Sequence, residues 1–374
     1  MIYIHIPFCK QKCSYCNFHF STSLNFKDDM LSAMKKEIFL RKDELQNKNL
    51  QSLYFGGGTP SILSPDEINS LIDEVLKYFS FSSDIEITLE ANPDDLDKNF
   101  LRELSKSPVN RLSIGTQSFF DEDLKLMNRA HNASEAESSI KRAQDFGFEN
   151  LSIDLIYGSP TSNMEIWKEN LQKTITLEVP HISSYALTVE PKTALENWIS
   201  KGKISSPKEE EQNKEFYYLS DFLKDNGFQH YEVSNFAKPD FYSRHNSSYW
   251  KYKEYLGIGP SAHSYNGFDV RSWNVANNQQ YIKKLNSNVL AKEEEVLSQE
   301  EQFNEMIMIG LRTIWGVDLE SLNNKFSDRI LEHFQREIKP KINDEVLVIE
   351  NNHLKIPEKH WFMADGIASD LFIV

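Results

Sequence analysis

Apolar positions in the first 190 residues fall into short continuous runs separated by longer amphipathic stretches. Short runs of this kind predict buried strands, and the stretches between them predict helices. The predicted strands cover residues 1–6, 53–55, 85–90, 111–115, 151–156 and 182–187. Strands that alternate with helices favour a parallel sheet with right-handed crossovers. The predicted fold class is therefore α/β, with six βα units forming a partial (β/α)6 barrel.

The helical stretches carry signals of their own. An apolar stripe through Leu31, Met34, Ile38 and Leu45 predicts the first helix. The second is predicted to begin at Ser64, which serves as N-cap, with Pro65 in the first position and Glu67 completing a capping box. We expect its core face to consist of Ile68, Leu71, Ile72, Val75, Leu76 and Phe79.

The pattern changes beyond residue 200 and predicts three domains: 1–200 as the barrel, 201–295 as an extension, and 296–374 as a C-terminal unit. The extension is predicted to hold a charged helix over 207–226, one strand over 231–236, and an irregular region that includes 245–250 and 257–263. The C-terminal unit is predicted to have helices near 300–314, 319–325 and 328–338. A hairpin turning at Asn351-Asn352 follows, which makes the unit α+β and similar to a winged helix.

Charge and composition limit the function classes. The chain carries a formal net charge of −15, and the segment from Gln299 onward has 8 Lys+Arg against 14 Asp+Glu, a net of −6. Phosphates would be repelled by such a surface, so no nucleic-acid partner is expected, despite the winged-helix pattern. No apolar run approaches the roughly 18 residues of a bilayer span, so at most peripheral membrane contact is expected. The N-terminus lacks signal-peptide features, and few cysteines are present, which indicates a cytoplasmic protein.

All three cysteines of the chain, Cys9, Cys13 and Cys16, lie within eight residues in a C-x3-C-x2-C run. An odd number of thiols excludes a disulfide framework, and a closed four-cysteine zinc site cannot form within one chain. Thiolates are soft ligands that suit iron–sulfur clusters. We therefore predict a cluster with one open position that binds a small molecule. The alternative is a zinc site that His5 or His19 completes.

Polar or glycine features stand at the end of every predicted strand. The cysteine loop follows the first strand and a triple glycine, 56–58, follows the second. The remaining four strands end near Glu90, Gln117, Asp154 and residues 185–186. Barrel enzymes place their sites at the carboxyl ends of their strands. Taken singly, each feature has an ordinary alternative, such as a tight turn, a helix cap or a surface charge, but their order favours one functional site.

Five motifs carry a family resemblance. The first motif is residues 3–16, which begin Tyr-Ile-His-Ile-Pro-Phe-Cys and end at Cys16. The other four are Gly-Gly-Gly-Thr-Pro at 56–60, Glu-Ala-Asn-Pro at 90–93, Gly-Thr-Gln-Ser-Phe at 115–119 and Ile-Asp-Leu-Ile-Tyr-Gly at 153–158. In this order, over nearly the whole chain, they resemble radical S-adenosylmethionine (SAM) enzymes, and specifically the oxygen-independent coproporphyrinogen III oxidase group.

The resemblance implies a cofactor set and a ligand set. The three cysteines would hold a [4Fe-4S] cluster whose open iron SAM chelates. The glycines would approach the methionine part of SAM, Glu90 its positive end, Gln117 and Arg129 its polar groups, and Asp154 the ribose. Other residues would shape the adenosine pocket. The full set of SAM-binding residues implied is Tyr3, Tyr15, Gly57, Gly58, Thr59, Glu90, Gln117, Arg129, Asp154, Ile156 and Ala186.

Three departures point to a particular branch of this group. Phe18 stands where the oxidases carry a further cysteine, and the cluster motif begins almost at Met1 rather than after an extension. Residues 244–250, Arg-His-Asn-Ser-Ser-Tyr-Trp, resemble the H-N-x-x-Y-W signature of a sister branch of heme chaperones. Imidazole is an axial ligand of heme iron, so His245 is the predicted heme ligand, with a packing role as the alternative. His263 is a second candidate, for which a structural role is expected.

The expected function is a heme chaperone that binds the cluster, SAM and heme b and delivers heme to respiratory proteins. A reductant protein such as a flavodoxin or ferredoxin and a homodimer are expected with it. The first alternative is a coproporphyrinogen III oxidase that decarboxylates propionates, and the second is a non-catalytic cluster-bearing scaffold. The protein is expected to act as a chaperone rather than as a coproporphyrinogen III oxidase.

Overall fold

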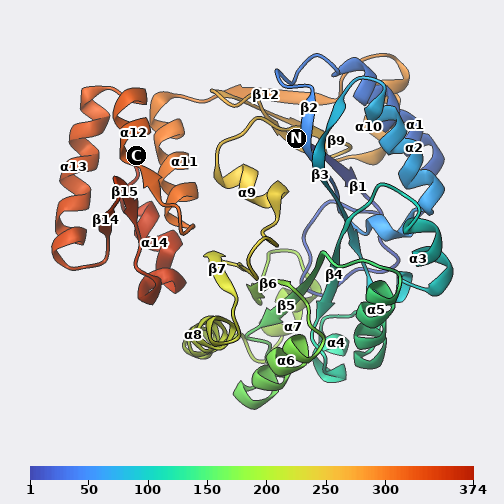
Figure 1. Ribbon diagram of the computed structural model, residues 1–374, viewed down its shortest axis with the longest axis horizontal. Coiled ribbons are helices and arrows are strands. Elements are labelled where there is room, and N and C mark those ends of the chain that lie inside the picture. The colour runs from blue at the N-terminus through green and yellow to red at the C-terminus, as the bar shows by residue number, and fades with distance from the viewer.

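The computed structural model describes all of residues 1–374, and a nine-stranded sheet forms its centre (Figure 1). The strand order is β7-β8-β6-β5-β4-β3-β2-β1-β9, and successive strands from β1 to β6 pair in parallel. This arrangement confirms the predicted six βα units. The six parallel strands are β1 (Ile2–Ile6), β2 (Asn49–Gly57), β3 (Ser80–Ala91), β4 (Arg111–Gln117), β5 (Leu151–Tyr157) and β6 (His181–Ala186).

Helices connect these strands and cover the outer face of the sheet in Figure 1. They are α1 (Lys27–Leu40), α2 (Pro65–Leu76), α3 (Lys98–Leu104), α4 (Asp121–Leu126), α5 (Ala133–Asp145) and α6 (Met164–Thr176), with short 3-10 turns at Pro60–Ile62 and Pro93–Asp95. The capping box of α2 is confirmed, because Glu67 N donates to Ser64 Oγ over 3.3 Å and Ser64 N donates to Glu67 Oε2 over 2.7 Å. The prediction for Leu76 was wrong: it ends the helix with 44% of its surface exposed.

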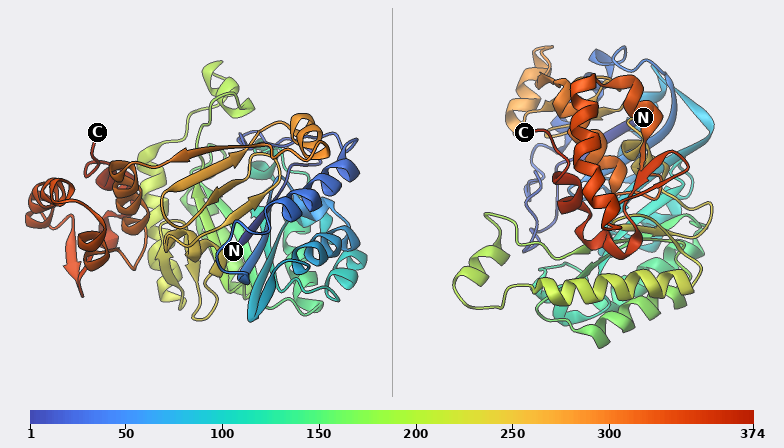
Figure 2. Two further views of the ribbon diagram at one scale, coloured as in Figure 1. Left: turned by 90° about the horizontal axis from the view of Figure 1, so that it is seen from above. Right: turned by 90° about the vertical axis from the view of Figure 1, so that its left-hand side faces the viewer.

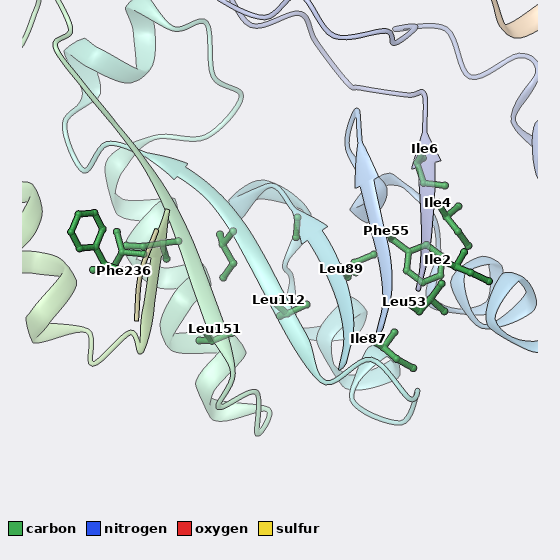
Figure 3. Packing of buried hydrophobic residues seen from close by; sticks show 14 of the residues in the cluster. Ile2, Ile4, Ile6, Leu53, Phe55, Ile87, Leu89, Leu112, Leu151 and Phe236 are labelled. Atoms are coloured by element: carbon green, nitrogen blue, oxygen red, sulfur yellow. The ribbon is translucent and has the colours of Figure 1, made fainter. Parts of the chain in front are cut away.

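Side chains of the parallel strands alternate between an apolar and a polar face. Ile2, Ile4 and Ile6 join the packed cluster of Figure 3, together with Leu53, Phe55, Ile87, Leu89, Leu112 and Leu151. The intervening residues face the barrel interior, since successive strand residues point to opposite sides. That interior is polar, and a small cavity of about 50 Å³ there is lined by groups such as Arg111, Asp154 and His181. The polar interior thus leads directly to the strand ends.

Two predictions for the extension were wrong. The single strand expected over 231–236 is a hairpin of β7 (Gln229–Glu232) and β8 (Asn235–Ala237), and β8 pairs antiparallel with β6. The region expected to be irregular contains α9 (Arg244–Trp250), whose N-cap Ser243 accepts from Asn246 N over 3.2 Å. It also contains β9 (Leu256–Ile258), which pairs in parallel with β1. Two helices, α7 (Ala194–Ser200) and α8 (Glu209–Asp225), precede this region.

A second, three-stranded sheet follows β9 and went unpredicted. It consists of β10 (His263–Tyr265), β11 (Val270–Asn274) and β12 (Lys292–Val296), with α10 (Asn278–Asn286) between the last two. A buried ion pair between Glu37 of α1 and Arg41, the residue that follows this helix, holds this segment to the barrel. Arg41 Nη1 donates to Glu37 Oε1 over 2.9 Å and to Gly257 O over 2.8 Å, while Asn274 Nδ2 donates to Glu37 over 2.7 Å.

The C-terminal unit lies at one end of the molecule (red in Figures 1 and 2). Its elements are α11 (Gln299–Leu311), β13 (Val317–Asp318), α12 (Leu319–Lys325), α13 (Asp328–Asn343), β14 (Val348–Glu350), β15 (His353–Lys355), a 3-10 turn at Glu358–Met363 and α14 (Ala364–Ser369). The hairpin turns at Asn351 and Asn352, both with positive φ, as the sequence predicts. No helix of the chain has both the length and the apolar character needed to cross a bilayer.

Candidate functional site

The three cysteines lie on the loop that follows β1, and the segment after α4 holds this loop in place. Ser14 Oγ donates to Leu126 O over 2.7 Å, and Ser14 N donates to Met127 O over 3.0 Å. Asn128 Nδ2 donates to Lys12 O over 2.7 Å from a backbone with φ of 54°. Asparagine tolerates this left-handed backbone conformation better than most residues, so Asn128 can hold the loop through its side chain.

The thiols of Cys9, Cys13 and Cys16 are free, and each is partly exposed. Two of them receive hydrogen bonds, from Thr59 Oγ1 to Cys9 Sγ over 3.4 Å and from Arg129 Nη1 to Cys13 Sγ over 3.3 Å. Burial raises the pKa of Cys9 to about 11, against the opposing effect of the Thr59 hydrogen bond. The two donors offset part of the cost of a buried thiolate, which is the form that ligates iron.

No three histidine, cysteine, aspartate or glutamate side chains of the chain meet closely enough to hold one metal ion. His5 and His19, the proposed fourth zinc ligands, are also engaged: His5 Nε2 bonds to His19 O over 3.0 Å, and His19 Nε2 to Asn278 Oδ1 over 2.7 Å. Both histidines are therefore occupied by hydrogen bonds within the chain.

The triple glycine brings the end of β2 against the cysteine loop. A Cβ added to Gly58 would lie 2.5 Å from Phe8 O, and one added to Gly57 would lie 2.6 Å from the ring of His5. Gly57 also has a φ of 105°, which other residues rarely adopt. Only residues without a side chain allow this approach, so the glycines form a cradle beside the thiols.

A cavity of about 510 Å³ opens between the cysteine loop and the strand ends. All three cysteines line it. Ten of the eleven residues that the resemblance implies also line it, namely Tyr15, Gly57, Gly58, Thr59, Glu90, Gln117, Arg129, Asp154, Ile156 and Ala186. The exception is Tyr3, which lines a neighbouring cavity and contacts His5 Nδ1 through its hydroxyl over 3.3 Å.

Arg129 is the cation of this cavity. Its Nη2 donates to Asn92 Oδ1 over 2.6 Å and to Gly115 O over 2.8 Å, which fixes the guanidinium. Its Nε is buried and has no partner within the chain. A buried donor without an acceptor costs about 1–3 kcal/mol, so the site fits a ligand that brings an acceptor there. Gln117 reaches the same cavity from a strained backbone, with φ of 65°.

Two buried carboxyl groups, Glu90 and Asp154, line the cavity at the strands. Glu90 accepts from Tyr54 OH over 2.8 Å and from Gly57 N over 3.2 Å, and Asp154 accepts from Ser113 Oγ over 3.4 Å. Burial raises the pKa of Glu90 to about 7 and that of Asp154 to about 6. A cation bound beside them would lower the pKa of both carboxyl groups and so favour their charged forms.

His245 lies on α9 and lines neither cavity, but it packs behind Tyr249, which lines the neighbouring one. It is 1% exposed, its Nδ1 bonds to Ser52 Oγ over 2.9 Å, and its Nε2 bonds to Tyr249 OH over 3.0 Å. Its ring also stacks on Tyr54 at 4.8 Å. Both ring nitrogens of His245 therefore have hydrogen-bond partners within the chain, as the alternative of a packing role would require. Its assignment as heme ligand stays a prediction, and ligation would require α9 to rearrange.

Several lining residues were missed at the sequence level. Asn92 orients Arg129, and Asn17 Nδ2 donates to Glu190 Oε2 over 2.8 Å, which ties the cysteine loop to the segment after β6. The Glu-Ala-Asn-Pro motif contains Asn92 and could have revealed it. Glu190 follows no motif, so only the fold brings it to the site.

Comparisons with known proteins agree with this geometry. The model of the radical SAM superfamily matches residues 3–173, and that of the HemN C-terminal domain matches residues 297–363. Heme chaperone HemW of Lactococcus lactis is 33% identical over 365 residues, covering 98% of this chain and 95% of that protein. Heme chaperone HemW of Bacillus subtilis is 34% identical over 327 residues, covering 87% and 86%.

A solved structure shares the fold. Coproporphyrinogen III oxidase (HemN) from Escherichia coli superimposes with a TM-score of 0.84 over 99% of this chain and 89% of that chain, at 24% identity. The radical SAM match over residues 3–173 and the three-cysteine loop thus define a radical SAM protein. Within that superfamily the chain belongs to the HemW family, because its full-length relatives exceed 30% identity over most of both chains.

Proposed function

We propose that this protein is a heme chaperone that binds a [4Fe-4S] cluster, SAM and heme b and passes heme to respiratory proteins. The observation that carries the proposal is the near full-length match to a named heme chaperone, with the three-thiol cavity intact. The loop also lacks the further cysteine of the oxidases, since Phe18 occupies that position. The proposal includes a cytoplasmic location, a homodimer, and a flavodoxin- or ferredoxin-type reductant.

The cavity residues take defined roles in this proposal. Cys9, Cys13 and Cys16 hold the cluster, and SAM lies between it and the strand ends. Bound there, the cluster would supply an electron for reductive cleavage of the SAM sulfonium. Arg129 Nε, buried without a partner, suits the SAM carboxylate, while Glu90 faces the positive end. The glycine cradle suits close backbone contact with the methionine part.

The proposal is tested by heme uptake. Anaerobically reconstituted protein should bind ferric heme stoichiometrically, shift its Soret band, and transfer the heme to an apo respiratory heme protein. Conversion of coproporphyrinogen III to protoporphyrinogen IX with a strong reductant would instead establish the oxidase alternative. A protein that neither takes up heme nor cleaves SAM would fit the scaffold.

SAM binding should depend on pH through Glu90. Because its pKa is about 7, the carboxyl is largely neutral at pH 6 and largely ionised at pH 8. A cationic ligand favours the ionised form, so binding releases a proton at low pH. We expect SAM affinity to rise about tenfold from pH 6 to pH 8, measured by anaerobic calorimetry.

Two variants separate this effect from other titrations. Glu90→Gln should bind SAM more weakly and lose the step near pH 7, because an amide does not titrate. Asp154→Asn should keep the step, although its own pKa of about 6 lies nearby. An unchanged pH profile in Glu90→Gln would show that another group governs the binding.

A further inference from the structure

A second cavity, of about 570 Å³, adjoins the first at the cysteine loop. It shares Asn17, Phe18, Gly57 and Glu90 with the first cavity, so the two meet at the loop. Its volume falls within the range of sites that hold a ligand the size of a large cofactor. The other residues that line it are Tyr3, His5, His19, Tyr249, Tyr255, Ser261, Ala262 and His263.

Three of these residues are histidines, and their ring nitrogens differ in availability. Both nitrogens of His5 contact protein groups, and Nε2 of His19 bonds to Asn278. His263 has an exposed side chain, and the structure contains no hydrogen bond to either of its ring nitrogens. Partial desolvation of the ring at the cavity wall, followed by the charge of Arg271, lowers the pKa of His263, which favours the neutral ring that ligates metals.

The backbone holds His263 firmly at the cavity edge. Gly257 lies so close to it that an added Cβ would collide with His263 O, and one added to Gly259 would lie 2.5 Å from His5 O. Gly259 has a φ of 102°, and the next turn has Ser261 at 65°. His263 also pairs with Trp273 across β10 and β11, with ring centroids 6.1 Å apart. The glycine-rich segment therefore brings an unengaged imidazole beside the end of β1.

Aromatic side chains supply apolar walls for a flat ligand. Tyr249 and Tyr255 meet edge to face at 4.8 Å on one side of the cavity. Phe18 stands on the cysteine loop with 69% of its surface exposed. A large apolar side chain that is exposed to water at the edge of a cavity suits a binding site, because a bound apolar ligand would cover it.

We propose that heme occupies this second cavity, with His263 as an axial ligand of its iron and Phe18 against the porphyrin face. The inference rests on the proposed heme-chaperone function and goes beyond it by naming the site and the ligand. His245, which bonds through both nitrogens, acts instead as a positioning residue: it orients Tyr249, which lines the cavity.

The test is a titration of ferric heme into the anaerobically reconstituted full chain, read by absorption and by electron paramagnetic resonance. His263→Ala should weaken heme binding at least tenfold and change the axial-ligand signature, and added imidazole should restore that signature. Phe18→Ala should weaken binding and leave the signature unchanged. Cluster content and SAM binding, measured in the same samples, report on folding. His353→Ala, on the C-terminal unit, is the control for adventitious heme–histidine contact.

Each result has one meaning. If wild-type protein takes up no heme, the proposed function fails, and the inference fails with it. If wild-type protein binds heme and His263→Ala retains its affinity and signature, only the inference is overturned. The same holds if His19→Ala or His245→Ala abolishes the axial signature while His263→Ala leaves it unchanged.

Discussion

Replacing Cys13 by serine should abolish cluster assembly. The chain has no other cysteine that could take over the position, and a hydroxyl is a hard, weak ligand for iron. Arg129 would also lose the sulfur that its Nη1 contacts over 3.3 Å. We expect iron and sulfide to fall from about four per chain to near zero after anaerobic reconstitution, with loss of the broad visible absorption.

Lys12→Ala is the matched control on the same loop. Its side chain is exposed, and its backbone carbonyl, which accepts from Asn128, is unaffected by the substitution. This variant should load a full cluster. If Cys13→Ser also retains a full complement of iron and sulfide, the loop does not hold the cluster in the way proposed.

The barrel and its cavity could be predicted because parallel strands place their carboxyl ends at one edge of a sheet. Gly57, Glu90 and Gln117 lie at or next to the ends of three strands, and Asp154 lies midway along β5; the register alone brings all four into one cavity. Strand periodicity and motif order were sufficient for that step. Leu76 shows where periodicity fails as a predictor of burial, because an apolar residue in phase with the core face of a helix can still be exposed in the last turn.

The extension could not be predicted in the same way, because its structure depends on contacts distant in the sequence. β9 has three residues and forms only against β1, while α9 has seven residues and no apolar stripe. The H-N-x-x-Y-W pattern drew attention to His245, but not to the bond with Ser52 that buries its ring. Conversely, His263 follows no such signature, and only the fold shows that its ring nitrogens are unengaged.

Arg41→Ala should give the largest loss of stability, about 3–5 kcal/mol, because it leaves Glu37 as a buried carboxylate without its cation. Both side chains are 1% exposed. Arg41 also donates to Gly257 O on β9 over 2.8 Å and to Ser264 Oγ over 3.0 Å on β10, the strand that contains His263. Denaturant unfolding should therefore show an early loss of this segment, and heme uptake should fall with it.

Two further variants isolate the role of the unpaired charge. Lys141→Ala removes an exposed ion pair of the same i,i+4 spacing, with Glu137 on α5, and should cost at most about 0.5 kcal/mol. The double variant Glu37→Gln/Arg41→Met removes both charges and keeps an acceptor for Gly259 N, so it should recover most of the lost stability. If it is as unstable as Arg41→Ala, the hydrogen bonds of Arg41, rather than charge balance, hold the extension on the barrel.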